Sequence, residues 1–275
     1  MKTLKKTTLL ALVVTASIAC ASSAFALAYG NNITIYDGEG PSKEDNEVEL
    51  GMEQTQRWDL EAFTLNGNVL TMIGGFDFKN GVPGYSNYKS GDIFISSDSS
   101  YGTPIEDSVT GDGLQPVNKN FGYEYALSVN WSNLSYDVYK LDPTDTTTTV
   151  WYNQNQTGTA TSNPWKYASG GTKVGTTGFG TGGGLLSDSV VSEYGLAGWD
   201  NDNKHYAVSF DLSSVIADAD LYGKNFYTHF TMGCGNDNMI GEGTAPVPEP
   251  GTMMLLGIGM MAMAIYGKRR MHKES

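Results

Sequence analysis

Short stretches in which apolar and polar residues alternate dominate the middle of the chain. Residues 123–131 carry Tyr, Tyr, Leu, Val and Trp at every second position, and residues 206–212 and 226–232 repeat this pattern. A period of two places the apolar side chains on one face of a strand. The dominant pattern therefore predicts short strands with one buried face.

Turn signals separate these strands. Asn66-Gly67-Asn68 joins two strand-like runs, 57–65 and 69–78. Asn-Gly predicts a β-hairpin because both residues tolerate a positive φ. Gly74-Gly75 interrupts the second run, which predicts a bulge or a bend there.

Helical signals are scarce by comparison. Only residues 213–219 are expected to form a short helix, and no stretch of the body keeps the helical period of about 3.6 residues for long. Many short strands with Gly, Asn and Asp turns are typical of β-sandwiches. We therefore predict an all-β, jelly-roll-like β-sandwich over residues 27–246.

The N-terminus has the pattern of a secretory signal peptide. A segment with three lysines precedes an apolar run at 9–19, and small residues follow at Ala24, Ala26 and Ala28. Small residues at alternate positions form the cleavage site of such peptides. We expect residues 1–26 to be the signal peptide, with signal peptidase cutting at residue 26 or 28.

The last segment, 247–275, has three parts in order. A proline-bracketed acidic joint opens it, formed by Val247, Pro248, Glu249 and Pro250. Proline cannot continue a helix or a central strand, so the joint is expected to be extended and accessible. An uncharged apolar run, 251–267, predicts one transmembrane helix, although it is shorter than the about 20 residues that span a bilayer comfortably. The basic tail 268–275 would hold its far end in the cytoplasm, and it begins with Lys268, Arg269 and Arg270.

Joint, apolar run and basic tail together resemble the PEP-CTERM sorting signal that an exosortase reads. The resemblance implies a Gram-negative bacterium that makes exopolysaccharide, transient residence in the inner membrane, and exosortase processing at residues 247–250. It further implies delivery to the cell surface or the biofilm matrix.

Residues 229–238 also resemble a segment of many exosortase-dependent surface proteins, which have β-rich bodies and no assigned enzymatic activity. Glu is expected before the Cys of that segment, where this chain has Gly233.

The acidic composition limits the partners. The chain has 17 Lys and Arg against 30 Asp and Glu, a formal net charge of −13. Nucleic acid is therefore not expected as a partner, because phosphate binding needs clustered basic residues. Divalent cations are favoured, and exopolysaccharide is a possible partner of the matrix protein.

Two loops are rich in oxygen ligands. Asp200 and Asp202 lie at alternate positions of one loop, and Asn236 and Asp237 form a second turn. Ca²⁺ takes about six to eight such oxygens, but neither stretch matches an EF-hand loop. Asn and Asp also occupy turns for conformational reasons. A Ca²⁺ site and ordinary turns both stay open, and no cofactor is certain.

Three aromatic residues lie in or beside loops rich in Gly, Asn and Thr, namely Trp165, Tyr167 and Trp199. Exposed rings of this kind would stack on sugars, whereas buried ones would belong to the core. These residues are the candidates for carbohydrate binding.

Catalytic motifs are not evident. His229 and Cys234 are five positions apart, so on a regular strand they would face opposite sides, and Cys234 is expected to pack as a small apolar residue. The sequence has no Gly-x-Ser-x-Gly and no His-Glu-x-x-His motif. We predict a non-enzymatic surface or matrix protein with a structural or adhesive role. The alternatives are a Ca²⁺-assisted carbohydrate-binding module and a secreted glycan hydrolase, whose two carboxylates have no local signature.

Overall fold

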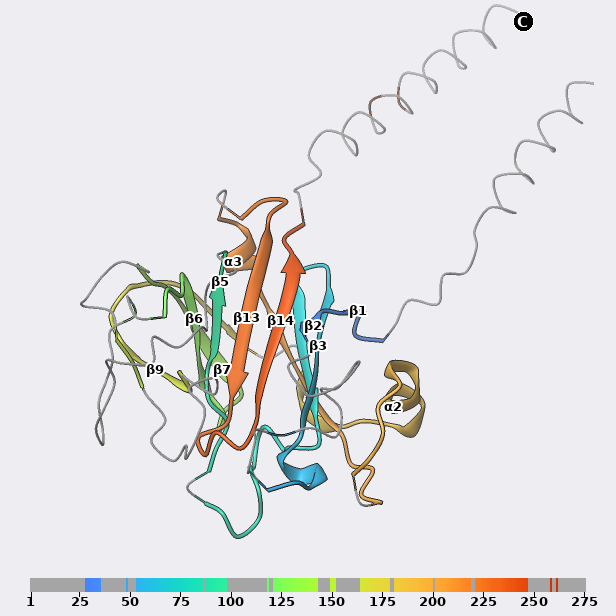
Figure 1. Ribbon diagram of the computed structural model, residues 1–275. Helices are drawn as coiled ribbons and strands as arrows, with labels where there is room; N and C mark the ends of the chain where they lie inside the picture. Colours follow the sequence, from blue (N-terminus) through green and yellow to red (C-terminus); the bar gives the residue numbers. More distant parts are fainter. Residues whose placement is uncertain are drawn as a thin grey trace, which may run out of the picture.

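Two antiparallel sheets form the body of the protein in the computed structural model (Figure 1). The structure describes residues 28–35, 53–86, 88–97, 121–142, 149–151, 164–178, 181–199, 201–218 and 221–246, together with the single residues 48, 118, 258 and 261. The predicted signal peptide 1–26, the sorting joint 247–250 and the basic tail 268–275 lie outside the described residues.

The first sheet, called sheet A, has five strands. In spatial order they are β1 (Asn31–Asn32), β3 (Leu60–Asn66), β4 (Val69–Gly74), β12 (Tyr206–Asp211) and β11 (Thr181–Leu185). The hairpin predicted at Asn66-Gly67-Asn68 is confirmed as the β3–β4 connection, with Gly67 at a φ of 58°.

The second sheet, called sheet B, has seven strands. In spatial order they are β10 (Thr172–Gly178), β7 (Ser135–Lys140), β6 (Tyr125–Asn130), β5 (Ile93–Ser96), β13 (Asn225–Thr231), β14 (Asn238–Thr244) and β2 (Thr34–Ile35). A separate two-stranded ribbon pairs β8 (Thr149–Trp151) with β9 (Lys166–Ser169).

The core lies between the two sheets. Strand β6 shows how the sequence places it there, because Tyr125, Leu127 and Val129 belong to the main buried cluster while Ala126 belongs to a smaller cluster on the opposite face of sheet B. Strands of sheet A contribute to the main cluster in the same way. The predicted β-sandwich is confirmed, and its jelly-roll-like character stays a prediction.

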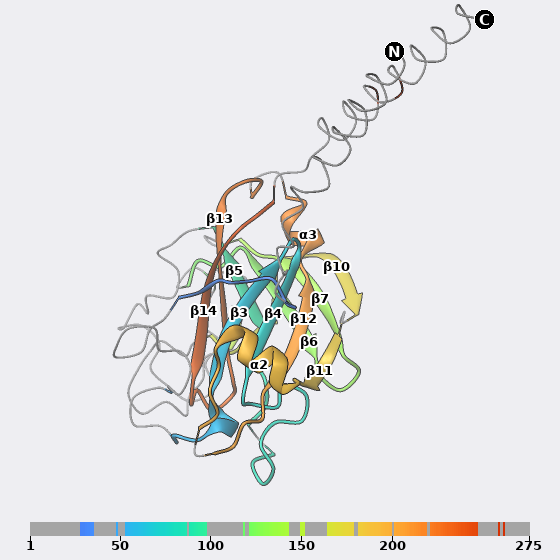
Figure 2. The same cartoon turned by 90° about the vertical axis from the view of Figure 1, so that its right-hand side faces the viewer.

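Helices are few and short in the described part of the chain. They are η1 (Gln56–Trp58), α2 (Asp188–Tyr194) and α3 (Ser213–Ile216). The helix expected at 213–219 is confirmed in its first turn, but the expectation that it is the only one in the body is wrong. Helix α2 lies over sheet A (Figure 2), buries none of its residues fully and ends at Gly195 with a φ of 72°. Its half-buried residues Val190, Val191 and Tyr194 lie at helical spacing, but a helix this short leaves a period too brief to stand out in the sequence.

The bulge or bend expected at Gly74-Gly75 is found as a bend at residues 75–76, and a bulge lies in the neighbouring strand. Strand β4 ends at Gly74, and the register shift falls in β3 between Leu60 and Ala62, so that Glu61 is the extra residue. A Cβ on Gly75 would lie 1.8 Å from the carbonyl oxygen of Gln56. Gly75 is thus explained by the close approach of the η1 backbone, and Gly74 by that of Asp59, whose carbonyl oxygen would lie 2.7 Å from a Cβ at this position.

A membrane-spanning helix is not found within the described residues, since none of their helices is both long and apolar enough. Of the predicted span 251–267, only Ile258 and Met261 belong to those residues.

Candidate functional site

A cleft of about 490 Å³ opens where the β6–β7 hairpin meets the segments before β5 and around the start of β9. Two tryptophans, Trp131 and Trp165, line it together with Lys89, Asp137 and Lys166. Serine and asparagine side chains of the hairpin complete the wall, at Ser128, Asn130, Ser132 and Ser135.

The peptide at Gly91 holds both tryptophans in place. The Gly91 N–H donates to the carbonyl oxygen of Thr231 (3.1 Å), and the Gly91 carbonyl accepts from the Trp131 indole (3.0 Å). The next N–H, from Asp92, donates to the carbonyl oxygen of Trp165 (2.8 Å). A Cβ on Gly91 would lie 2.1 Å from that oxygen, so the approach requires glycine.

The carboxylate of Asp92 makes further hydrogen bonds next to the Gly91 peptide. It is fully buried and accepts from the N–H of Val129 (2.8 Å) and from the N–H of Tyr167 (2.9 Å). It thereby ties β6 to β9. Burial raises the pKa of Asp92 to about 7, although these two hydrogen bonds and the charge of Lys166 act in the opposite direction.

The raised pKa of Asp92 predicts a pH-dependent stability. Between about pH 4 and pH 7 the folded state holds a proton on Asp92 that the unfolded state has lost, so its contribution to the free energy of unfolding falls as the pH rises through that range. We expect the fall to be on the order of 3 kcal/mol. Urea unfolding at about pH 4.5 and about pH 7.5, which together cover most of this range, measures it. An Asp92→Asn variant with the same pH slope as the native protein would contradict this assignment.

The ring of Trp165 rests on a glycine. A Cβ on Gly233 would lie 3.2 Å from Cζ3 and 3.3 Å from Cε3 of this ring, so a large side chain there would displace the indole. This contact gives a physical reason for Gly233 in the segment where Glu is expected. The Nζ of Lys166 lies 5.7 Å from the centroid of the same ring, within the range of a cation–π contact.

The other two aromatic candidates have different surroundings. Tyr167 is 9% exposed and stacks on Tyr139 with a centroid distance of 4.5 Å. Trp199 packs beside the main core, and its backbone N–H donates to the side-chain oxygen of Gln56. Of the three candidates, Trp165 lines the cleft. Trp131 was not among them, because alternation marked it only as an inward-facing strand residue.

The residues considered for Ca²⁺ have protein partners where they are described. Asp237 is 1% exposed and accepts from the N–H groups of Leu60 (2.6 Å) and Asn238 (2.8 Å). Asn236 exchanges two hydrogen bonds with the backbone of Glu53.

In the first Ca²⁺ loop, Asp202 lies 3.9 Å from the Lys204 amino group, and Asp200 lies outside the described residues. No group of three or more His, Cys, Asp or Glu that could hold a metal occurs among the residues the structure describes. The Ca²⁺ site stays a prediction.

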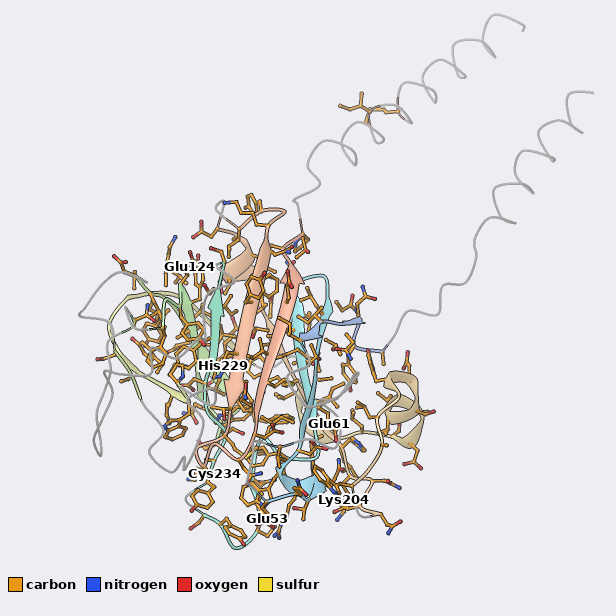
Figure 3. The ribbon with its side chains drawn as sticks, viewed as in Figure 1. Glu53, Glu61, Glu124, Lys204, His229 and Cys234 are labelled. Carbon is orange, nitrogen blue, oxygen red and sulfur yellow. The ribbon has the colours of Figure 1, made fainter. Side chains whose placement is uncertain are left out.

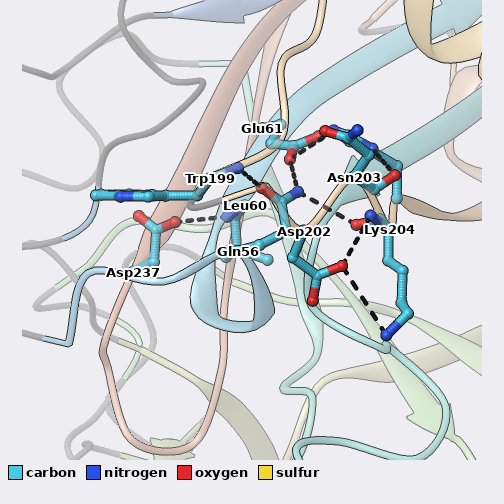
Figure 4. Close-up of polar contacts among 9 residues, drawn as sticks. Gln56, Leu60, Glu61, Trp199, Asp202, Asn203, Lys204 and Asp237 are labelled. Atoms are coloured by element: carbon cyan, nitrogen blue, oxygen red, sulfur yellow. Dashed lines mark hydrogen bonds and ion pairs between the residues drawn. The ribbon is translucent and has the colours of Figure 1, made fainter.

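A buried polar network lies at one end of sheet A (Figure 4). Glu61 Oε1 is 3.1 Å from His205 Nε2, and both side chains are inaccessible to solvent. Gln56 donates to the same Glu61 oxygen (2.6 Å), while His205 Nδ1 faces the carbonyl oxygen of Asn203 (2.9 Å). Glu61 and His205 thus meet inside the protein, with each imidazole nitrogen facing an oxygen atom. Their enclosure suits a structural role rather than catalysis.

His229 and Cys234 do not form a dyad. Figure 3 places His229 within β13 and Cys234 beyond its end. His229 lies beside the ring of Tyr123, which belongs to the outer cluster of sheet B, whereas Cys234 belongs to the core between the sheets. The prediction that Cys234 packs as an apolar residue is confirmed.

Burial raises the pKa of the Cys234 thiol to about 11, which suppresses the reactive thiolate. We expect the native protein to react with Ellman's reagent at pH 8 about 100-fold more slowly than the protein unfolded in urea. Removal of the predicted signal peptide 1–26 would take Cys20 with it, so the unfolded processed protein should then react with one equivalent of the reagent. Rapid stoichiometric reaction of the folded protein would contradict the burial of Cys234.

Comparison with known proteins identifies the C-terminus. Residues 246–270 match the family described as the PEP-CTERM protein-sorting motif. No curated protein and no solved structure matches the chain. The chain therefore carries a C-terminal PEP-CTERM protein-sorting motif, which marks it as an exosortase-dependent exported surface protein.

Proposed function

We propose that the mature protein is a non-enzymatic component of the surface or extracellular matrix of a Gram-negative bacterium, with a structural or adhesive role. The observation that carries this proposal is the sorting motif at residues 246–270, directly behind a β-sandwich body. Signal peptidase would cut at residue 26 or 28. The apolar run 251–267 would then hold the body at the inner membrane until an exosortase acts at residues 247–250.

The position of the motif relative to the fold supports this order of events. Strand β14 ends at Thr244, and Ala245 is still buried, with its N–H donating to the carbonyl oxygen of Lys224 (2.9 Å). The matched motif begins at residue 246. Processing at residues 247–250 would therefore leave every strand of both sheets in the mature protein.

The sorting proposal is tested by replacing Pro248, Glu249 and Pro250 with alanine in the native host. We expect the variant to keep the mass of the unprocessed C-terminus and to stay with the inner membrane. Mass spectrometry of fractionated cells measures both properties. Glu242→Gln, an exposed change in β14 just before the motif, serves as the control and should be processed normally. Normal mass and surface delivery of the triple variant would refute the proposal.

Carbohydrate binding is the second candidate function, and the position of Trp165 at the cleft favours it. A half-buried indole beside serine and asparagine side chains suits the apolar face and the hydroxyl groups of a sugar. Glycoside hydrolysis would need two carboxylates across the cleft. Among the described residues, Asp137 is the one acid that lines it, and it is paired with Lys173 (2.8 Å). We therefore favour binding over hydrolysis.

A further inference from the structure

We propose that the cleft between Trp131 and Trp165 binds a segment of an acidic polysaccharide. A uronic-acid ring would lie against the indole of Trp165, with its carboxylate near Lys89 and Lys166. This inference rests on the proposed role at the surface or in the matrix, and it names the class of ligand that such a role would involve.

The rigid position of Trp165 is the first argument. Its carbonyl oxygen accepts from the Asp92 N–H, the following strand is held to the Asp92 carboxylate through Tyr167, and its ring rests on Gly233. These contacts come from two parts of the chain far from Trp165 in sequence, at Asp92 and at Gly233. A ring fixed in this way loses little conformational entropy when a ligand stacks on it, which is the advantage of a preorganised site.

The charge at the cleft is the second argument. Lys89 and Lys166 both line it, although the chain as a whole carries a formal net charge of −13. Four other basic residues of the described chain lie within 4.0 Å of a carboxylate, namely Arg57, Lys140, Lys173 and Lys204. Lys166 instead lies over the Trp165 ring. An anionic sugar would therefore meet the charges of Lys89 and Lys166 here, while the charge of Asp137, the acid in the described lining, is offset by Lys173 (2.8 Å).

The opposite wall supplies hydrogen-bonding groups. Ser128 pairs with Asp137 across β6 and β7, and Asn130 pairs with Ser135, so their side chains alternate with the core-facing Val129. Hydroxyl and amide groups at this spacing suit the hydroxyl groups of a sugar chain. A neutral glycan would use the same wall and the same indole but would gain nothing from the lysines.

The test uses the full-length chain purified in a polyoxyethylene detergent, which has no sugar headgroup, and a hexamer of galacturonic acid as the probe. Isothermal titration calorimetry should show saturable binding that weakens as salt is added. Trp165→Ala should weaken it about tenfold or more. Joint replacement of Lys89 and Lys166 by Gln should weaken it several-fold and remove most of its salt dependence.

Lys224→Gln is the matched control and should leave binding unchanged. Lys224 precedes β13, whereas the cleft lies at the other end of that strand, where Ser90 bridges Met232. Lys89 and Lys224 are exposed, so changes there should keep the fold, whereas Lys166 is half-buried. Thermal melts will check the double lysine variant and Trp165→Ala.

Three results would overturn the inference: absence of binding, equal binding by Trp165→Ala, and equal binding of a neutral glucose hexamer. Normal sorting of a chain that does not bind the hexamer would refute the cleft proposal and leave the proposed surface function standing. A chain that binds the hexamer but is not processed by the host would instead remove the proposed surface function.

Discussion

Replacing Glu61 by alanine is expected to lower the free energy of unfolding by about 3–5 kcal/mol, as for other buried pairs that lose one partner. Glu61 is 1% exposed and is the extra residue of the bulge in β3. The bulge directs its carboxylate to His205, just before β12, and to Gln56 in η1. The substitution would leave the imidazole of His205 enclosed without its carboxylate. Urea unfolding monitored by tryptophan fluorescence measures the loss.

Two further variants distinguish the loss of the Glu61–His205 pair from the general effect of truncating a side chain. Glu242→Ala removes an exposed carboxylate from β14 and should change the free energy of unfolding by less than about 1 kcal/mol. Replacing Glu61 and His205 together by leucine should cost less than the sum of the two single changes, because it removes both partners. A loss below about 1 kcal/mol for Glu61→Ala would show that the pair does not hold this end of sheet A.

Local patterns in the sequence were enough for most of the strands. Alternation placed the buried face of β6, and Asn66-Gly67 placed the β3–β4 hairpin, because both signals act over a few residues. The bulge at Glu61 could not be predicted in this way, since the extra residue contacts His205, far along the chain. Helix α2 was missed for a different reason. Its apolar residues Val190, Val191 and Tyr194 have helical spacing, but the helix is too short for this period to stand out.

The cleft shows the same division between local and long-range causes. Trp165 could be selected as an aromatic residue in a Gly- and Asn-rich stretch, but the same reasoning selected Tyr167, which is buried against Tyr139. Period-two alternation separates the two faces of a strand, yet it says nothing about what covers each face. Gly91 could not be singled out from the sequence, because its role depends on the backbones of Trp165 and Thr231.

Gly91→Ala is expected to lower the free energy of unfolding by about 3 kcal/mol and to abolish binding at the cleft. The added Cβ would lie 2.1 Å from the carbonyl oxygen of Trp165 and 2.6 Å from that of Thr231. Both are backbone atoms, and both accept hydrogen bonds at this junction, so neither can move without breaking one. Because the same peptide accepts from the Trp131 indole, both tryptophans would be displaced.

Gly178→Ala is the matched control, because no atom lies within 4 Å of its added Cβ and β10 is an edge strand. It should change the free energy of unfolding by less than about 0.5 kcal/mol and leave ligand binding intact. The comparison isolates steric contact, since both glycines have backbone conformations that alanine can adopt. A Gly91→Ala protein as stable as Gly178→Ala would mean that the chain relaxes at this junction. The two tryptophans would then not be held rigidly, and the cleft would not be preorganised for a ligand.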